Sequence, residues 1–228
     1  MKKILLGFIA IGLFTFVGCG TSSSVEYGEG VTDFKGNTYK SVKIGKQEWM
    51  AENLNVNHFQ NGEIIPEAKT EEEWAKARVE NRPVWCFYDN DISIGGKYCK
   101  LYNWYAVNDP RGLAPKGWHV PTNFEWNLLT DYLAANGHSG AEGKALKSTS
   151  GWNNNGNGTD NYGWLGLPGG NRYDYGNFHD IGVFGYWWSS SERDPSNAWT
   201  RTLEYGTGRL SRNYGHKKNG FSVRCLRD

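Results

Sequence analysis

Aromatic side chains constrain the fold of this chain more than any other feature of its sequence. The 228 residues include 11 Trp, 13 Tyr and 10 Phe, although hydrophobic residues of all kinds make up only 38%. A disordered chain would be poor in aromatic rings, so the composition indicates a folded domain. The 30 glycines add many positions that are suited to turns. We therefore expect one loop-rich domain whose core is built from large flat side chains.

The N-terminal residues are typical of an exported protein. Two lysines precede an apolar run over residues 4–17, which is too short to span a bilayer and matches a secretory signal. Residues 16–19 resemble a bacterial lipobox, in which a small residue precedes a cysteine that becomes lipidated. We therefore predict a signal peptide over 1–18, lipidation of Cys19 and a lipidated tether over 19–32. The alternative is an ordinary secreted protein with an incidental cysteine.

The charges of the chain are balanced, with 25 Lys and Arg against 24 Asp and Glu. A nucleic-acid-binding protein would need a basic stripe that displaces counterions from phosphate, so this class of partner is excluded. The same balance leaves no basic patch for a membrane surface. Attachment to a membrane would therefore come from acyl chains.

Three cysteines follow Cys19, and an odd number leaves at least one thiol free or paired between molecules. Cys86 and Cys99 flank a turn-rich segment, and an exported protein can form disulfides. We therefore predict a bridge between these two residues. No second Cys or His lies at a ligand spacing, so we predict no metal site here.

Local signals mark one hairpin and two helices. Polar and apolar residues alternate over 38–49, next to a turn at 35–37, which predicts a hairpin at the start of the domain. Thr70 and Glu73 form one capping-box pattern, and Thr122 and Glu125 form a second. Each pattern predicts the start of a helix.

Residues 148–177 are mostly Gly, Asn, Trp and Tyr, which predicts a long ordered loop. Four large side chains are candidates to anchor it: Trp152, Tyr162, Trp164 and Leu165. The Asn and Asp residues could supply oxygen ligands to a structural Ca²⁺, but they lack the regular acidic spacing of a calcium loop. Left-handed turns at Asn and Gly are the favoured interpretation.

The C-terminal forty residues predict three short strands over 197–205, 209–214 and 221–226. In the first strand, Trp199, Arg201, Leu203 and Tyr205 alternate with Thr200, Thr202 and Glu204, so the two sets lie on opposite faces. One face would carry a mixture of small polar, Arg, Tyr and His side chains. Such a mixture suits an adaptable binding surface, although any exposed face of an antiparallel sheet can carry it.

Several sequence blocks resemble the Fibrobacter succinogenes major paralogous domain, and they occur in order from Asp33 to Asp228. The blocks are residues 33–39, 44–54, 101–107, 115–122, 167–170 and 222–225.

The resemblance implies an α+β fold of the C-type-lectin type, in the branch of the formylglycine-generating enzymes. Such a fold has two helices, short antiparallel strands and long loops, here over residues 33–228. Members of this family include surface lipoproteins whose C-terminal stretch is diversified by a retroelement that mutates adenines. By this resemblance, residues 188–225 would form a variable region.

In that region the resemblance separates a binding face from a fixed scaffold. The ligand-binding residues would be Arg193, Thr200, Thr202, Glu204, Thr207, Arg209, Ser211, Asn213, Tyr214 and His216. Gly206 and Gly215 would also be variable. The scaffold would comprise Trp199, Arg201, Leu203, Tyr205 and Arg212.

One position departs from the family pattern. Many relatives carry a cysteine two residues before the Lys-Gly-Trp motif, where this chain has Ala114. The common bridge to Cys225 is therefore unavailable, and we expect Cys225 to be a buried free thiol.

These observations together favour a binding module that is lipid-anchored in the outer membrane and exposed on the cell surface. Its ligand would be a protein or glycan on another cell, a host or a phage. The alternatives are a structural or adhesion subunit with one fixed partner and a degenerate enzyme of the formylglycine-generating branch. We expect no enzyme and no cofactor, because the copper-binding cysteine pair is missing and His119 fits a packed core position better than a catalytic base.

Overall fold

The computed structural model of the protein describes residues 24–228 and has the α+β composition that the sequence predicts. The predicted signal peptide, Cys19 and the first residues of the tether lie outside the described residues. The helices are α1 (Glu71–Glu80), α2 (Ile92–Tyr98), α3 (Trp104–Val107), α4 (Asn123–Leu133) and α5 (Glu142–Leu146), with short turns η1 (Tyr88–Asn90), η2 (Ala134–His138) and η3 (Asn153–Asn155). Within 24–228 none of the helices has the length and apolar character needed to cross a membrane.

Most strands are short, and within residues 24–228 they form four sheets. They are β1 (Val31–Thr32), β2 (Thr38–Tyr39), β3 (Ser41–Ile44), β4 (Gln47–Met50), β5 (Trp85–Cys86), β6 (Leu101–Tyr102), β7 (Trp118–His119), β8 (Gly169–Arg172), β9 (Phe178–Ile181), β10 (Phe184–Glu192), β11 (Asn197–Glu204), β12 (Ser211–His216) and β13 (Leu226–Arg227). The two larger sheets have the orders β12-β11-β10-β8-β9 and β3-β4-β13-β7.

Both predicted capping boxes are present. Thr70 Oγ1 accepts a hydrogen bond from the Glu73 amide at 3.1 Å at the start of α1. At the start of α4, Thr122 Oγ1 accepts from the Glu125 amide at 3.2 Å, and Glu125 Oε2 accepts from the Thr122 amide at 2.7 Å. These bonds satisfy amide groups that a helix start leaves unpaired.

The N-terminal residues form two hairpins rather than one. The turn at 35–37 joins β1 to β2, and a second turn at Gly45 joins β3 to β4. Residues of the predicted tether also pack on the domain: Tyr27 pairs with Val42, and the Lys43 amide donates to the Glu26 carbonyl at 2.8 Å. The domain therefore begins earlier than the predicted boundary at residue 33.

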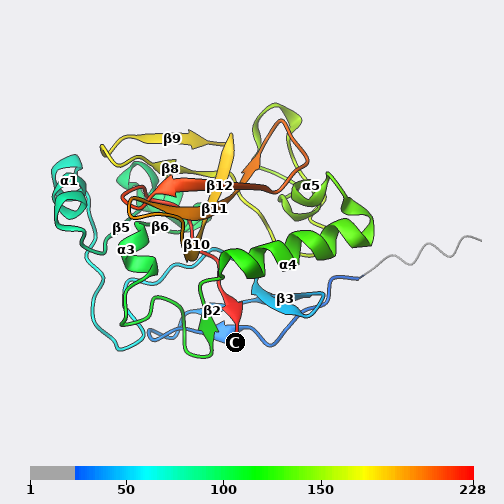
Figure 1. Ribbon diagram of the computed structural model, residues 1–228, viewed down its shortest axis with the longest axis horizontal. Coiled ribbons are helices and arrows are strands. Elements are labelled where there is room, and N and C mark those ends of the chain that lie inside the picture. Colours follow the sequence, from blue (N-terminus) through cyan, green and yellow to red (C-terminus); the bar gives the residue numbers. More distant parts are fainter. Residues whose placement is uncertain (1–23) are drawn as a thin grey trace, which may run out of the picture.

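Helix α4 lies between the two larger sheets (Figure 1). Its buried face joins a core to which both sheets and the long loop contribute. The ring of Trp126 lies 4.7 Å from that of Trp49 and 6.0 Å from that of Trp164, which lies 5.0 Å from Trp187. Rings from separate elements thus meet in one cluster, as the composition predicts. Six buried tryptophans, which we call the frame tryptophans, contribute to the cores: Trp49, Trp104, Trp118, Trp126, Trp187 and Trp188.

A second core covers the other face of the five-stranded sheet. Trp188 packs there against Phe221, with ring centres 4.5 Å apart, and its Nε1 donates to the Tyr102 carbonyl at 2.8 Å. Ala198 of β11 belongs to the same cluster. Trp187 and Trp188 are consecutive in β10, and their side chains therefore lie in two different cores.

The long loop is anchored by fewer side chains than predicted. Trp152 and Trp164 are buried and Tyr162 is partly buried, but Leu165 is exposed. Asn154, Asn155, Asp160 and Leu165 have φ values between 44° and 58°. The three Asn and Asp positions thus supply the left-handed turns that the sequence favours, and Leu165 points outward from such a turn.

The predicted bridge between Cys86 and Cys99 is wrong, because both residues are free thiols. Cys86 lies beside Arg172 and Glu67, whereas the charged neighbours of Cys99 are Arg224, Lys100 and Glu52. The two thiols therefore face different surroundings. Cys225 is a buried free thiol, as predicted.

Candidate ligand-binding face

Strands β10, β11 and β12 are antiparallel neighbours, and β12 forms the edge of the sheet. In β11 and β12, Trp199 pairs with Tyr214 and Arg201 pairs with Arg212. Directly opposed residues of antiparallel strands point to the same side. We call this side the α4 face. The opposite face carries the pairs Thr200 with Asn213 and Thr202 with Ser211.

The sequence interpretation placed the predicted ligand-binding residues on one face of the sheet. In the structure they lie on both faces. Thr200 and Thr202 are only 1% and 4% exposed, because they lie beside Trp188 and Tyr186 on the covered side of the sheet. Asn213 Nδ2 donates to Thr202 Oγ1 at 3.2 Å. Both threonines are structural residues, and their assignment to the binding surface was wrong.

The other predicted positions are at least partly accessible. Of these, Glu204, Ser211 and His216 are half-buried, and Arg193, Thr207, Arg209, Asn213 and Tyr214 are exposed. The two predicted variable glycines differ. A Cβ atom at Gly206 would meet its nearest neighbour at 3.7 Å, whereas one at Gly215 would lie 2.5 Å from the Phe221 ring. Gly206 can accept side chains and Gly215 cannot.

The start of α4 decides which part of the α4 face is covered. Asn123 is the first residue of α4, and its Oδ1 accepts hydrogen bonds from Arg201 at 3.1 Å and from Arg212 at 3.0 Å. Trp199 and Tyr214 lie two residues further along their strands, past this end of the helix. Tyr214 is 54% exposed and Trp199 is half-buried. Trp199 and Arg212, predicted to be scaffold, thus belong to the accessible surface.

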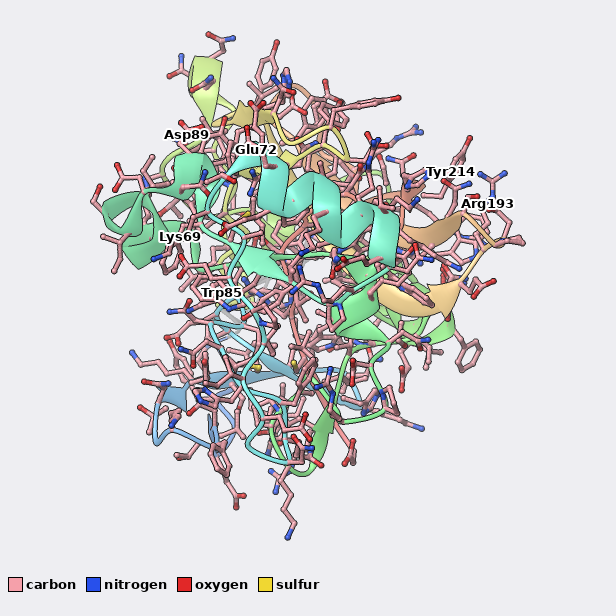
Figure 2. The ribbon with its side chains drawn as sticks, turned by 90° about the vertical axis from the view of Figure 1, so that its left-hand side faces the viewer. Lys69, Glu72, Trp85, Asp89, Arg193 and Tyr214 are labelled. Carbon is pink, nitrogen blue, oxygen red and sulfur yellow. The ribbon has the colours of Figure 1, made fainter. Side chains whose placement is uncertain are left out.

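Four side chains stack on one another at this place, and we call them the arginine–aromatic cluster: Arg193, Trp199, Arg212 and Tyr214. The guanidinium carbon of Arg193 lies 3.4 Å from the Tyr214 ring centre and 5.7 Å from that of Trp199. That of Arg212 lies 3.6 Å from the Trp199 ring centre. Figure 2 shows Arg193 and Tyr214 side by side at the periphery of the molecule, pointing away from its body. Cation–π contacts of this kind hold the side chains in a defined arrangement.

The cluster carries positive charge that few acidic groups balance. In the described part of the chain, no carboxylate lies within 4.0 Å of Arg201, Arg209 or Arg212, and Arg193 approaches Asp194 at 3.9 Å. Arg201 is almost fully buried. Burial, together with the charge of Arg212, lowers the pKa of Arg201 to about 10.

The turns that flank this surface are held by bonds of their own. Lys147 is buried, and its Nζ donates to the carbonyls of Glu204 at 3.0 Å, Tyr205 at 3.3 Å and Thr207 at 2.9 Å. Between β10 and β11, Asp194 Oδ1 accepts from the Asn197 amide at 2.9 Å. The exposed side chains therefore sit on a fixed backbone.

His119 is the main candidate for other chemistry, and it is half-exposed rather than packed in a core. Its Nδ1 lies 2.7 Å from Asp228 Oδ1, and its Nε2 lies 2.9 Å from Glu125 Oε1. Burial alone would lower the pKa of His119, but the two carboxylates outweigh burial and raise the pKa above 6.5. Within residues 24–228, no three His, Cys, Asp or Glu side chains gather as a metal site.

Comparison with known proteins identifies the family of the chain. No curated protein matches it. A family model described as the Fibrobacter succinogenes major domain matches residues 42–227, which is most of the chain and includes α4 and all but the first residue of the two larger sheets. The chain therefore belongs to the Fibrobacter succinogenes major domain family.

Proposed function

We propose that this protein is a ligand-binding module of the cell envelope and that the edge formed by β11 and β12 is its binding face. The observation that carries the proposal is the exposed arginine–aromatic cluster. Trp, Tyr and Arg are the residue types that dominate binding energy at protein interfaces. Here they are preorganised on strands whose other side is buried at Ala198, Thr200 and Thr202.

The proposal also includes the anchor and the fold type that the sequence favours. Lipidation of Cys19 would attach the domain to the outer membrane, facing the cell surface. A C-type-lectin-like arrangement would present the edge strands as the ligand site. Labelling cells with a radioactive fatty acid tests the anchor: a Cys19→Ala chain should lose the label, and retained label would contradict lipidation.

Diversification by a retroelement is part of the same proposal, with a smaller variable set than the family resemblance implies. Thr207, Arg209, Asn213 and Tyr214 are exposed and would be the variable positions, whereas Thr200, Thr202 and Gly215 are packed. A near-copy of the segment encoding 188–225, differing only at adenines and lying beside a reverse transcriptase gene, would support this. A lone gene without such a copy favours the alternative of one fixed partner.

An enzymatic role fits the described residues less well. Both ring nitrogens of His119 are engaged by carboxylates. Burial raises the pKa of Cys86 to about 12 and of Cys99 to about 11, so neither thiol is a ready nucleophile near neutral pH.

Site-specific photocross-linking tests the binding face directly. A photoreactive phenylalanine analogue replaces Tyr214 in one version of the chain and Val79, an exposed residue of α1, in the other. Cells that display either version are irradiated together with neighbouring cells. Adducts formed from position 214 and not from position 79 would support the proposal. Equal adducts at both positions, or none at 214, would overturn it.

A further inference from the structure

We propose that the arginine–aromatic cluster recognises an acidic segment of a partner protein and binds its carboxylates at the free edges of Arg193 and Arg212. This inference rests on the proposed function, because it names the chemical class of ligand for the same face. Three properties of the cluster support it: the guanidinium N–H groups that remain free, the balance of charge and the ring surfaces that are already occupied.

The stacking leaves hydrogen-bond donors free. A guanidinium that lies over a ring uses its flat face for that contact and keeps its N–H groups in the plane, pointing outward. Among the described residues, the Arg193 side chain donates no hydrogen bond, and Arg212 donates only from Nε, to Asn123. The terminal nitrogens of both residues remain available. A planar pair of N–H groups matches a carboxylate through two parallel hydrogen bonds.

Charge balance favours an anionic ligand. Arg201 and Arg212 are cross-strand partners that share the Asn123 Oδ1 acceptor, so two positive groups lie close together. Arg209 lies on the same side of the molecule, at a depression of about 580 Å³ that Arg212 also lines. Glu142 lines this depression as well, but it is buried and accepts a hydrogen bond from the Gly140 amide at 2.8 Å. A carboxylate of a partner would supply the missing negative charge.

The occupied ring surfaces favour a protein over a sugar. Arg212 covers one face of Trp199, and Arg193 lies over Tyr214 and near Trp199. One face of each ring is thus occupied, which reduces the ring surface on which a sugar could stack. Arg193, Trp199 and Tyr214 also lie on an open edge outside the depression, unlike the lining of the concave pockets that enclose most small ligands. Exposed Arg, Trp and Tyr on an open surface are typical of protein interfaces.

Binding of fluorescently labelled poly-L-glutamate to the full chain in detergent, followed by anisotropy, tests the inference. We expect the double variant Arg193→Gln/Arg212→Gln to lose roughly tenfold or more in affinity. The matched control is Arg111→Gln/Arg227→Gln, which removes the same charge from arginines paired with Glu63 and Glu48 elsewhere. The control should change affinity by less than about twofold. Equal losses in both double variants would overturn the inference.

A second pair of variants separates geometry from charge. Arg193→Lys/Arg212→Lys keeps the net charge but lacks the planar fork, and we expect most of the tenfold loss to persist. Full affinity in the lysine variant would overturn the carboxylate geometry. Polygalacturonate serves as a carboxylated sugar probe. If it bound as tightly as poly-L-glutamate and with the same dependence on the arginines, the assignment to a protein partner would be wrong.

The two proposals fail in different ways. If poly-L-glutamate binding ignored the arginines while position 214 still formed adducts on cells, the acidic ligand would be excluded and the binding face would stand. If position 214 formed no adduct, the binding face itself would be excluded. Thermal unfolding of every variant confirms folding, and a midpoint within about 4 °C of the unmodified chain is expected for these exposed or half-buried positions.

Discussion

The two faces of the β10–β12 strands differ in how their burial changes along the strands. On the opposite face, Trp188, Ala198, Thr200 and Thr202 are all covered by the core. On the α4 face, burial ends at Arg201, and Trp199 is accessible one alternation away. A covered side chain and an accessible side chain thus follow one another along the same face of the same strand. A binding surface can therefore be set apart by where a covering helix begins, as well as by strand alternation.

The largest effect should come from removing a ring of the covered face. Trp188→Ala deletes a fully buried side chain and its bond to Tyr102, and we expect a loss of about 3–5 kcal/mol in unfolding free energy. Trp199→Ala removes a ring that is only half-buried, and about 1 kcal/mol is expected. Urea denaturation measures both. Equal losses would mean that the α4 face is as deeply covered as its counterpart.

The boundary of the covered area is tested at Arg201 and Arg212. Arg201→Gln breaks the bonds to Asn123 and Asn127 from a buried position, so we expect a loss of about 2–3 kcal/mol. Arg212→Gln, at the exposed cross-strand partner, should cost less than about 1 kcal/mol. Melting followed by circular dichroism distinguishes the two. A larger loss of stability for Arg212→Gln than for Arg201→Gln would mean that the covered area extends over Arg212 as well.

A smaller contrast separates two threonines that the sequence placed together on the binding face. Thr202→Ala removes the hydroxyl that accepts from Asn213 in a buried position, and about 1 kcal/mol should be lost. Thr207→Ala changes an exposed side chain and should stay within roughly 0.5 kcal/mol. Chemical unfolding curves decide. If Thr202→Ala were neutral, the covered face would be looser than its packing indicates.

The smallest effect concerns the start of α4, where His119 contacts Glu125. The pKa of His119 is raised in the folded protein, so its charged form stabilises the fold fully below pH 6.5 and loses that effect as the pH rises through the folded pKa. The unfolding free energy of the unmodified chain should therefore decline slightly above pH 6.5. A His119→Gln chain should lack this decline, and parallel pH profiles for both chains would contradict it.

Local features of the fold were predictable because they depend on neighbouring residues. Both capping boxes join residues three apart, and the turn at 35–37 is specified by its own Gly and Asn. The burial of the frame tryptophans was also predictable, because removing large apolar rings from water stabilises the folded state. These signals fixed where elements begin and which rings enter the core, without giving their positions in space.

The proposed binding face required information that the local sequence does not contain. Alternation divides β11 into two sets, but only the register with β12 puts Tyr214 beside Trp199 rather than Thr200. How far the Trp199 set is covered depends on where α4 begins, about seventy-five residues earlier in the chain. The predicted bridge between Cys86 and Cys99 was wrong for a related reason, because two residues that are close in sequence do not necessarily share the same surroundings.

The hydrogen bonds of the Lys147 ammonium group do not depend on the side chains of the residues that it binds. It donates hydrogen bonds only to carbonyl oxygens at the end of β11 and in the turn that follows, and every amino acid carries such an oxygen. Exchanges of side chains in this turn therefore leave the anchor intact, whereas an insertion or deletion moves the carbonyls out of reach. The surface can thus change its chemistry freely while the length of the segment stays constant.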